Sequence, residues 1–227
     1  MNSFSYKTIF TKRKTISIIL SPTGKITIRA PYGTPKKTIE DLLNKKADWI
    51  QKHLTKYTDY HRLTPDRAYR NGDPVLFLGR EYPLKLSESG SNYIQLSDTN
   101  IEAFIKAPIE DNKVRMILEK WYLFQAGKVI RCKVQDIITL HSRYGFSPSE
   151  IVTKRLKSRW GSCSTRGRIT INSELIKLEM RFLEYVIIHE LCHLKYHNHG
   201  KDFYRLLEQI VPDYKIVRQE LRKYIIE

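Results

Sequence analysis

The chain of 227 residues is long enough to bury a sizeable core, and its hydrophobic content of 41% is ordinary for a globular protein. We find no apolar run of about 18 residues that could span a membrane and no signal peptide at the N-terminus. We therefore expect a cytoplasmic protein without a membrane partner. The three cysteines, Cys132, Cys163 and Cys192, are scattered and form no CxxC pair, which excludes a disulfide framework.

The formal net charge of +16 is spread along the chain. Residues 1–100 hold 17 Lys and Arg against 9 Asp and Glu, and residues 101–227 hold 23 against 15, so each part contributes +8. A positive field of this size favours anionic partners, which makes nucleic acid a candidate partner. A solvated basic surface with no specific partner explains the same charge.

The first 108 residues are predicted to form a β-rich portion with one helix. Two β-branched runs, Thr15–Leu20 and Lys25–Ala30, flank a turn signal at residues 21–24 and predict a β-hairpin. Pro35 opens a helix whose apolar residues recur at helical spacing as far as Leu54. A polar loop over Tyr57–Pro74 then leads to a set of short strands. We expect these strands at Val75–Leu78, Glu81–Leu86, Tyr93–Leu96 and Ala103–Lys106.

Residues 109–227 are predicted to form the catalytic domain. Apolar residues from Val114 to His141 trace one long helix that ends near Gly145. Strands at Glu150–Arg155 and Arg168–Asn172 flank a loop rich in Gly and Ser. Three helices follow, at Met180–Tyr196, Lys201–Val211 and Asp213–Ile226. The predicted fold class is therefore α+β.

The helix predicted at Met180–Tyr196 carries the segment His189-Glu190-Leu191-Cys192-His193, which has the pattern HExxH. Residues four apart lie on one face of a helix, so His189 and His193 can present imidazole nitrogens to one metal ion. Glu190 lies next to that ion, where it can take a proton from metal-bound water. Burying these polar groups in an apolar helix is costly unless a ligand satisfies them. The segment predicts a zinc ion held by the histidines, with Glu190 as general base.

A third zinc ligand is expected beyond the end of this helix. His199 lies six residues after His193, and Gly200 permits the turn that would bring it back. His197 is the competing residue, because it lies one turn beyond His193. We favour His199, because catalytic zinc sites of this type draw their third ligand from beyond the helix. The alternative hypothesis for all these histidines is a surface cluster at a helix C-terminus.

Further motifs accompany this segment along nearly the whole chain. They are Lys46–Ile50, Leu78–Pro83, Lys157–Ser164, Ile169–Asn172, Asn198–Gly200 with Phe203, and Pro212–Tyr214 with Arg218. Together the motifs resemble the YgjP-like metal-dependent hydrolases, which are related to the SprT and WLM zincins. The resemblance implies a zincin-like catalytic domain, zinc held by His189, His193 and His199, Glu190 as general base, and peptide or protein substrates.

Two segments near the metal ligands are candidates for substrate binding and catalysis. Zincins lay an extended substrate along an edge strand, and Arg168–Asn172 is the expected edge strand. Trp160 is a candidate wall of the substrate pocket, although core packing of Trp160 and a capping role of Asn172 explain the same residues. The developing oxyanion needs a further hydrogen-bond donor. Tyr214 is the predicted catalytic residue for this role, with Arg159 and His197 as alternatives and simple packing of the tyrosine as a third interpretation.

The sequence thus predicts a zinc metallopeptidase that hydrolyses peptide bonds with metal-activated water. A second hypothesis is a protease that acts on DNA-bound proteins. It rests on the stretch Lys154–Arg168, which holds six Lys and Arg and no acid. A third hypothesis is hydrolysis of a non-peptide amide.

Overall fold

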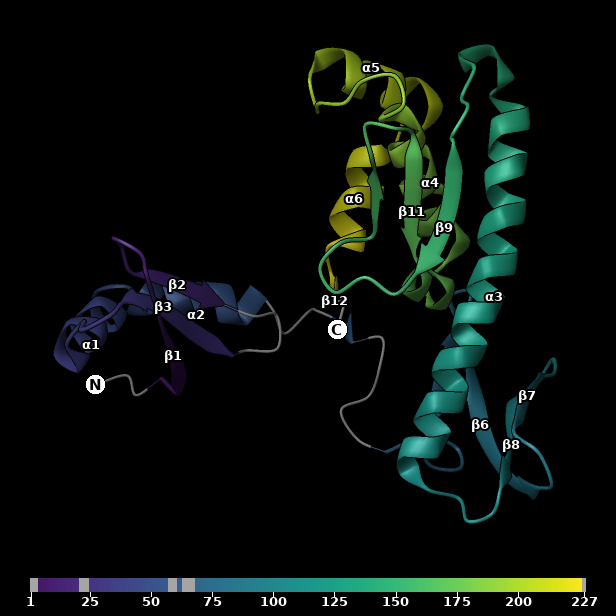
Figure 1. The fold of residues 1–227 in the computed structure, drawn as a ribbon, viewed down its shortest axis with the longest axis horizontal. Coiled ribbons are helices and arrows are strands. Elements are labelled where there is room, and N and C mark those ends of the chain that lie inside the picture. The colour runs from purple at the N-terminus through teal and green to yellow at the C-terminus, as the bar shows by residue number, and fades with distance from the viewer. Residues whose placement is uncertain (1–3, 21–24, 57–60, 63–67, 226–227) are drawn as a thin grey trace. The chain divides into compact units, whose positions relative to one another are not determined.

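The computed structural model describes residues 4–20, 25–56, 61–62 and 68–225 (Figure 1). The chain divides into two compact units, residues 1–61 and 62–227. The domain boundary predicted after residue 108 therefore lies inside the second unit. The assignment of residues 109–227 to a catalytic domain stays a prediction. None of the helices in the described ranges is long and apolar enough to cross a membrane.

The first unit contains a three-stranded sheet of β1 (Tyr6–Thr11), β2 (Ser17–Leu20) and β3 (Ile26–Pro31) in the order β1-β3-β2. Strands β2 and β3 are antiparallel, as expected for the predicted hairpin, whose turn at residues 21–24 lies outside the described residues. Strand β1 was not predicted. It pairs in parallel with β3, so its place depends on a partner about twenty residues away rather than on a local turn.

Two helices cover the sheet of the first unit where the sequence predicts one. Helix α1 (Lys36–Lys45) and helix α2 (Ala47–Lys56) are separated at Lys46, whose φ of −106° and ψ of 11° depart from helical values. Ile39 and Ile50 both belong to the buried cluster around Ile28. Because both helices bury their apolar faces against the same sheet, the hydrophobic spacing continues across the break and conceals it.

The second unit begins with a four-stranded sheet in the order β5-β6-β8-β7. Its strands are β5 (Pro74–Phe77), β6 (Arg80–Ser89), β7 (Tyr93–Leu96) and β8 (Ile101–Lys106), which confirms the four predicted strands. The two-residue strand β4 (His61–Arg62) lies at the boundary of the units, within the predicted loop. Alternate residues of β8, including Ile101 and Ile105, are fully buried in the core.

The predicted long helix is present as α3 (Asp111–Leu140), followed by a 3-10 turn at Ser142–Tyr144 and by Gly145 in a left-handed conformation. Its first half packs on the four-stranded sheet, where the rings of Trp121 and Phe77 lie 5.1 Å apart. Its second half runs alongside β9 (Figure 1). One helix therefore joins two sheets into a single unit.

The second sheet holds β9 (Glu150–Lys154), β10 (Gly161–Cys163) and β11 (Arg168–Asn172) in the order β10-β11-β9. The prediction that Arg168–Asn172 is an edge strand is wrong. Strand β11 is central, parallel to β9 and antiparallel to β10, and its residues Ile169 and Ile171 are buried. The edges are β9 and β10. The sequence predicts β10 as loop because three residues containing Gly and Ser carry no strand pattern.

The remaining elements complete the second unit (Figure 1). They are a 3-10 turn at Ser173–Lys177, which was not predicted, then α4 (Met180–Cys192), α5 (Lys201–Ile210), α6 (Tyr214–Leu221) and the short β12 (Tyr224–Ile225). Helix α4 packs against β10 and β11. It ends four residues before the predicted Tyr196, because the amides of Leu194 and Lys195 bond carbonyls three residues back and tighten the chain into a turn. Helix α6 also ends early, where the chain enters β12.

Candidate active site

Three imidazoles converge at the C-terminal end of α4. Ligand-capable nitrogens of His189, His193 and His199 all lie within 4.8 Å of one another, and the Nε2 atoms of His189 and His199 face each other at 3.0 Å. Nitrogens that each lie 2.0–2.1 Å from a tetrahedral zinc ion are about 3.3 Å apart. The three side chains therefore fit a zinc ion with little movement.

The turn after Cys192 brings His199 to the other two histidines. His193 closes α4, and its Nδ1 donates a hydrogen bond to the carbonyl oxygen of Tyr196 at 3.0 Å, which leaves Nε2 available for a metal. Gly200 then starts α5 in an extended conformation. The side chain of His199 returns toward the helix, as expected, but the φ of −82° at Gly200 is one that any residue adopts, so this turn does not depend on the conformational freedom of glycine.

Phe203, from the first turn of α5, forms the base of the histidine cluster. It is fully buried, and its ring centroid lies 5.0, 4.6 and 4.7 Å from those of His189, His193 and His199. Packing against one rigid ring restricts the rotation of all three imidazoles. The motif that joins Phe203 to His199 did not predict this contact, because the role of Phe203 depends on α5 folding back onto α4.

Burial and neighbouring positive charge keep His189 and His199 in the form that binds metals. Burial, reinforced by His193, His199 and Arg218, lowers the pKa of His189 to about 3. Burial also lowers the pKa of His199, with His193 and Arg218 acting in the same direction. Both rings are neutral at pH 7 and can donate a nitrogen lone pair. The Nδ1 atom of His189 is buried and has no hydrogen-bond partner among the described residues.

Glu190 lies next to this cluster and is only 5% exposed. Burial raises the pKa of its carboxyl to about 7, while the nearby Arg159 acts in the opposite direction. A carboxyl with a pKa near neutrality can both accept and return a proton at pH 7.

Gly161 in β10 provides the space that the Glu190 carboxylate occupies. A Cβ atom at this position would lie 2.7 Å from Oε1 and 2.8 Å from Cγ of Glu190, well inside van der Waals contact. Glycine is therefore required for the close approach of β10 to α4. Sequence reasoning missed this role, because Gly161 and Glu190 are far apart along the chain.

A cavity of about 300 Å³ opens beside His189, Glu190 and His199. Trp160, together with Gly161, lines one side. The indole also packs against the main core, so the two interpretations of Trp160, pocket wall and core residue, both hold. On the other side α6 contributes Arg218 and neighbouring residues. The sequence named Arg218 only as part of a motif, not as a site residue.

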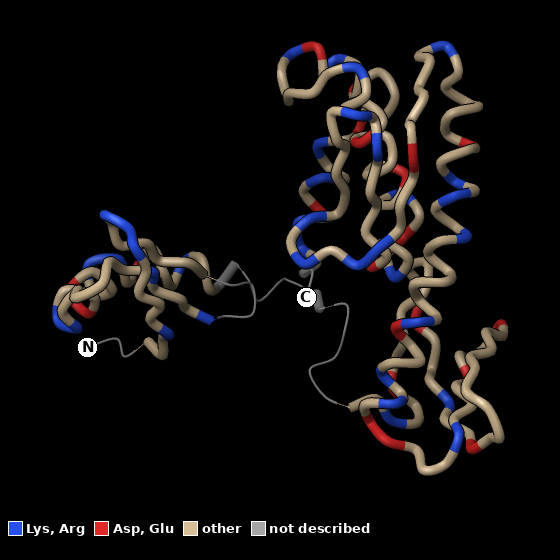
Figure 2. The backbone as a smooth tube through the Cα atoms, viewed as in Figure 1, with Lys and Arg blue, Asp and Glu red and all other residues tan. Residues whose placement is uncertain are grey.

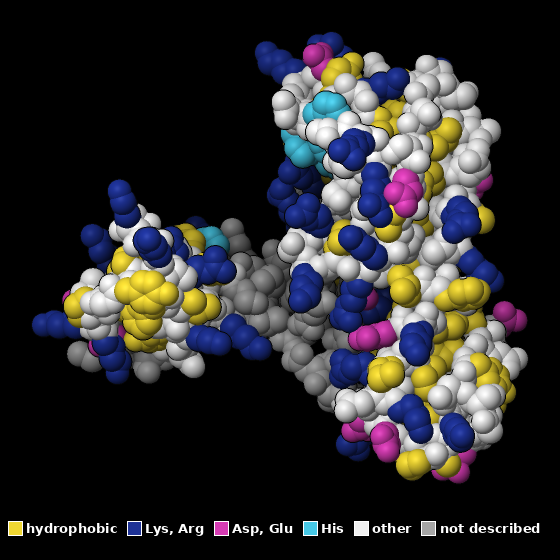
Figure 3. Space-filling view, in the orientation of Figure 1, with side chains coloured by type: hydrophobic (Ala, Val, Ile, Leu, Met, Phe, Trp, Pro, Cys, Tyr) yellow, Lys and Arg dark blue, Asp and Glu magenta, His cyan; other side chains and the backbone are white. Residues whose placement is uncertain are grey.

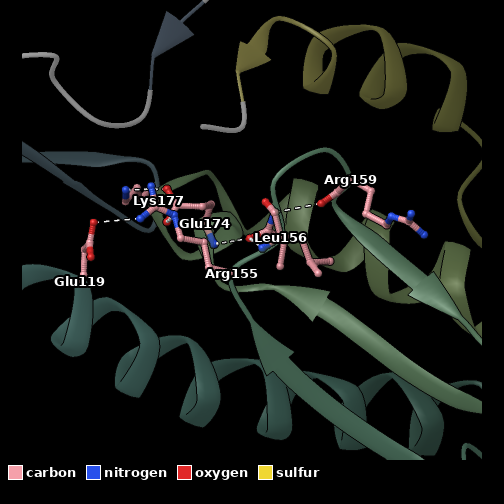
Figure 4. Close-up of polar contacts among 7 residues, drawn as sticks. Glu119, Arg155, Leu156, Arg159, Glu174 and Lys177 are labelled. Atoms are coloured by element: carbon pink, nitrogen blue, oxygen red, sulfur yellow. Dashed lines mark hydrogen bonds and ion pairs between the residues drawn. The ribbon is translucent and has the colours of Figure 1, made fainter. Parts of the chain in front are cut away.

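Asn172 holds the loop that carries Trp160. Its Nδ2 donates to the carbonyl oxygens of Leu156 and Arg159, each at 2.9 Å, and its Oδ1 accepts from the amide of Glu174 at 3.1 Å (Figure 4). The predicted capping role of Asn172 is thus confirmed. The guanidinium of Arg159 points away from this polar cluster, as Figure 4 shows.

Behind the loop lies a buried ionic cluster that the sequence did not predict. Lys177 Nζ is 2.6 Å from Glu174 Oε2, and Arg155 contacts both Glu174, at 3.7 Å, and Glu119 of α3, at 2.9 Å (Figure 4). Burial lowers the pKa of Lys177, and the Glu174 carboxylate opposes this effect. The cluster ties α3, the end of β9 and the 3-10 turn together, so it fixes the base from which the loop starts.

Two other predicted site residues lie apart from the histidines. Tyr214 is buried at the start of α6 and stacks on Tyr204 with ring centroids 5.8 Å apart. It does not line the cavity, so its packing corresponds to the structural interpretation, and its catalytic role stays a prediction. His197 is exposed and is not part of the histidine cluster.

Comparisons with known proteins agree with this chemistry. The model of the YgjP-like family, described as a metallopeptidase domain, matches residues 14–224. Similar solved structures include two metallopeptidase zymogens. Jannalysin of Methanocaldococcus jannaschii is 23% identical with a TM-score of 0.37, over 41% of this chain and 94% of that chain. Abylysin of Pyrococcus abyssi is 23% identical with a TM-score of 0.36, over 40% of this chain and 90% of that chain. No curated protein matches the sequence.

Proposed function

Because the chain belongs to the YgjP-like family of metallopeptidase domains and is therefore a metal-dependent hydrolase, we propose that it is a zinc peptidase with Glu190 as its general base. One observation carries the proposal. Three imidazoles converge within 4.8 Å beside a buried carboxyl whose pKa is about 7. This donor set, two or three histidines with an adjacent glutamate, is typical of catalytic zinc sites that keep a position open for water.

His189, His193 and His199 would hold the zinc ion. When bound, zinc would polarise the scissile carbonyl and increase the acidity of a water molecule. The Glu190 carboxylate would accept the proton of the attacking water and pass it to the leaving amine. Gly161 keeps this carboxylate free to lie toward the cavity, because no side chain at that position competes for the space.

The edge strand β10 supports a peptide as substrate. Only one side of β10 pairs within the sheet, with β11. Its other side can add an extended peptide through main-chain hydrogen bonds. Since Gly161 of β10 contacts Glu190, a peptide added there would run past the proposed base.

Metal analysis and hydrolysis together test the proposal. Zinc-loaded protein should hold about one zinc ion per chain and cleave an unfolded protein mixture. His189→Ala should lose the metal, whereas His197→Ala, which changes an exposed histidine outside the cluster, should retain it. Glu190→Gln should keep the metal and lose activity by about 10²–10⁴-fold. Full activity in Glu190→Gln, or zinc binding in His189→Ala equal to that of the wild type, contradicts the proposal.

The basic surface favours a second candidate function, a peptidase that acts on nucleic-acid-bound proteins. Lys and Arg follow the loop between β9 and β10 (Figure 2), and they surround the exposed histidines of the second unit (Figure 3). Binding of duplex DNA across a salt titration tests it, because neutralised phosphates give a steep dependence of affinity on salt. Hydrolysis of a small amide in place of any peptide would instead favour the third hypothesis. The cytoplasmic location stays a prediction.

A further inference from the structure

Two arginines of α6 line the same cavity as the histidine cluster. Arg218 and Arg222 are four residues apart, and the amide of Arg222 bonds the carbonyl oxygen of Arg218 at 3.3 Å. The pair therefore lies on one face of the helix, with the two Cα atoms about 6 Å apart along its axis. Leu221 between them completes this wall of the cavity.

The cavity is also lined by the turn of α4 that precedes the proposed zinc ligands. Tyr185 and Val186 lie one turn before His189 and Glu190, and they line the cavity with them. Burial raises the pKa of Tyr185 to about 12, and the charges of Arg218 and Arg222 both oppose this shift. Both arginines and Tyr185 line the same cavity. The lining of the cavity thus combines the histidine cluster, a turn of α4 and two cations.

Among the described residues, no acidic side chain forms an ion pair with Arg218 or Arg222. Within the same part of the chain, Glu190 is the one acidic residue that lines the cavity. Arg218 donates from Nη1 to the hydroxyl of Tyr204 at 3.3 Å. A guanidinium has five N–H donors, so most of its hydrogen-bonding capacity remains.

A carboxylate is the substrate group that best matches such a wall. Arginine binds a carboxylate through two parallel hydrogen bonds, and this pairing is strongest where neighbouring apolar surface limits access of water. Peptides carry carboxylates at the C-terminus and on Asp and Glu side chains. Because the arginines and the histidines line one cavity, a carboxylate bound by the arginines would belong to a residue within a few positions of the peptide bond held at the histidine cluster.

We propose that Arg218 and Arg222 form a carboxylate-binding subsite, which selects peptides with a carboxylate close to the scissile bond. The proposal rests on the peptidase function proposed above and adds the substrate class. A cavity with such a subsite differs from a general peptide groove, because the peptide must carry a negative charge at a fixed distance from the metal centre.

Binding of short peptides to the full-length, zinc-loaded Glu190→Gln variant, which should keep the metal and lose activity, tests the subsite without hydrolysis. In one arm, calorimetry compares Gly-Leu with its C-terminal amide; in the other, it compares Gly-Glu amide with Gly-Gln amide. We expect the carboxylate peptide to bind about tenfold or more tightly in at least one arm, as hydrogen bonds to charged groups do. The arm that shows the preference identifies the C-terminal or the side-chain carboxylate as the group recognised.

Variants of α6 assign the preference to the arginines. Arg222 is exposed, so Arg222→Gln should fold normally and reduce the preference by about tenfold. Arg218→Lys keeps the charge but removes the planar fork, so it should weaken the preference while preserving the fold, as circular dichroism would verify. Lys215→Gln is the matched control. It removes one charge from the same helix, at a side chain that is 73% exposed and outside the cavity, and should leave the preference unchanged.

Equal binding of acid and amide in both arms would overturn the subsite, and so would a preference that survives both Arg222→Gln and Arg218→Lys. These results are independent of catalysis. A wild-type protein that binds carboxylate peptides preferentially but cleaves no peptide would overturn the proposed function and retain the subsite.

Discussion

The two sheets of the second unit share helix α3 but differ in what they bury. Strands β5 to β8 bury aliphatic and aromatic side chains. The second sheet, with the 3-10 turn and helix that follow it, buries polar groups as well. In the described residues, every buried polar or charged side chain lies between positions 170 and 190. They are Thr170, Asn172, Ser173, Glu174, Lys177 and Glu190.

The sheet of β5 to β8 is thus a structural platform, whereas the second sheet, with the 3-10 turn and α4, is the functional region. A buried polar group lowers stability unless it is hydrogen-bonded or paired. Several buried polar groups close together therefore indicate a structural or functional role for that region. Here most of them form a scaffold. Asn172 holds the loop of Trp160, and the Glu174–Lys177 pair fixes the start of that loop. Glu190 is the exception, because its carboxyl faces the cavity and the histidines rather than a scaffold partner.

Removing one member of the buried ion pair should produce the largest loss of stability. Lys177→Met leaves the Glu174 carboxylate buried, with Arg155 at 3.7 Å as its remaining ion-pair partner among the described residues. We expect the free energy of unfolding to fall by about 3–5 kcal/mol. Denaturant unfolding measures this change. The double variant Glu174→Leu/Lys177→Met should be less destabilised than the single variant, and the opposite order would contradict the buried-charge explanation.

Gly161→Ala should affect activity more than stability. The new Cβ would lie 2.7 Å from Glu190 Oε1, so the carboxylate must move. A displacement of about 1 Å at a catalytic group can cost up to about 10²-fold, and we expect a loss of kcat/KM of about 10–100-fold. Zinc content should be unchanged.

Gly127→Ala provides the matched control for this substitution. An added Cβ at position 127 of α3 meets no atom within 4 Å. In a helix, alanine is more favourable than glycine, so this variant should gain about 0.5–1 kcal/mol of stability and keep full activity. Equal losses of activity in the two variants would show that Gly161 has no particular relation to Glu190.

The smallest effect is expected in the four-stranded sheet. Ile105 of β8 is fully buried among apolar residues. Ile105→Val should reduce the free energy of unfolding by about 0.5–1.5 kcal/mol and leave kcat/KM unchanged. Thermal unfolding and a peptide-cleavage assay check the two parts. A loss of activity without a loss of stability would end the distinction between platform and functional region.

The sequence determined the parts of this protein that depend on neighbours along the chain. The spacing of His189, Glu190 and His193 predicts their common helix face, because helical geometry is local. The long apolar pattern of α3 and the strands of the first sheet are confirmed for the same reason. Position and nearby glycine also favoured His199 over His197, and the cluster contains His199.

Only the tertiary structure decided the features that depend on distant contacts. Strand β10 is an edge strand because it pairs with β11, and Gly161 matters because α4 packs across it. Arg218 reaches the cavity because α6 lies beside α4. The raised pKa of Glu190 follows from burial, which no local pattern encodes. Local geometry therefore predicted the histidine cluster, whereas the shape and charge of the site around it arise from packing between segments far apart in the chain.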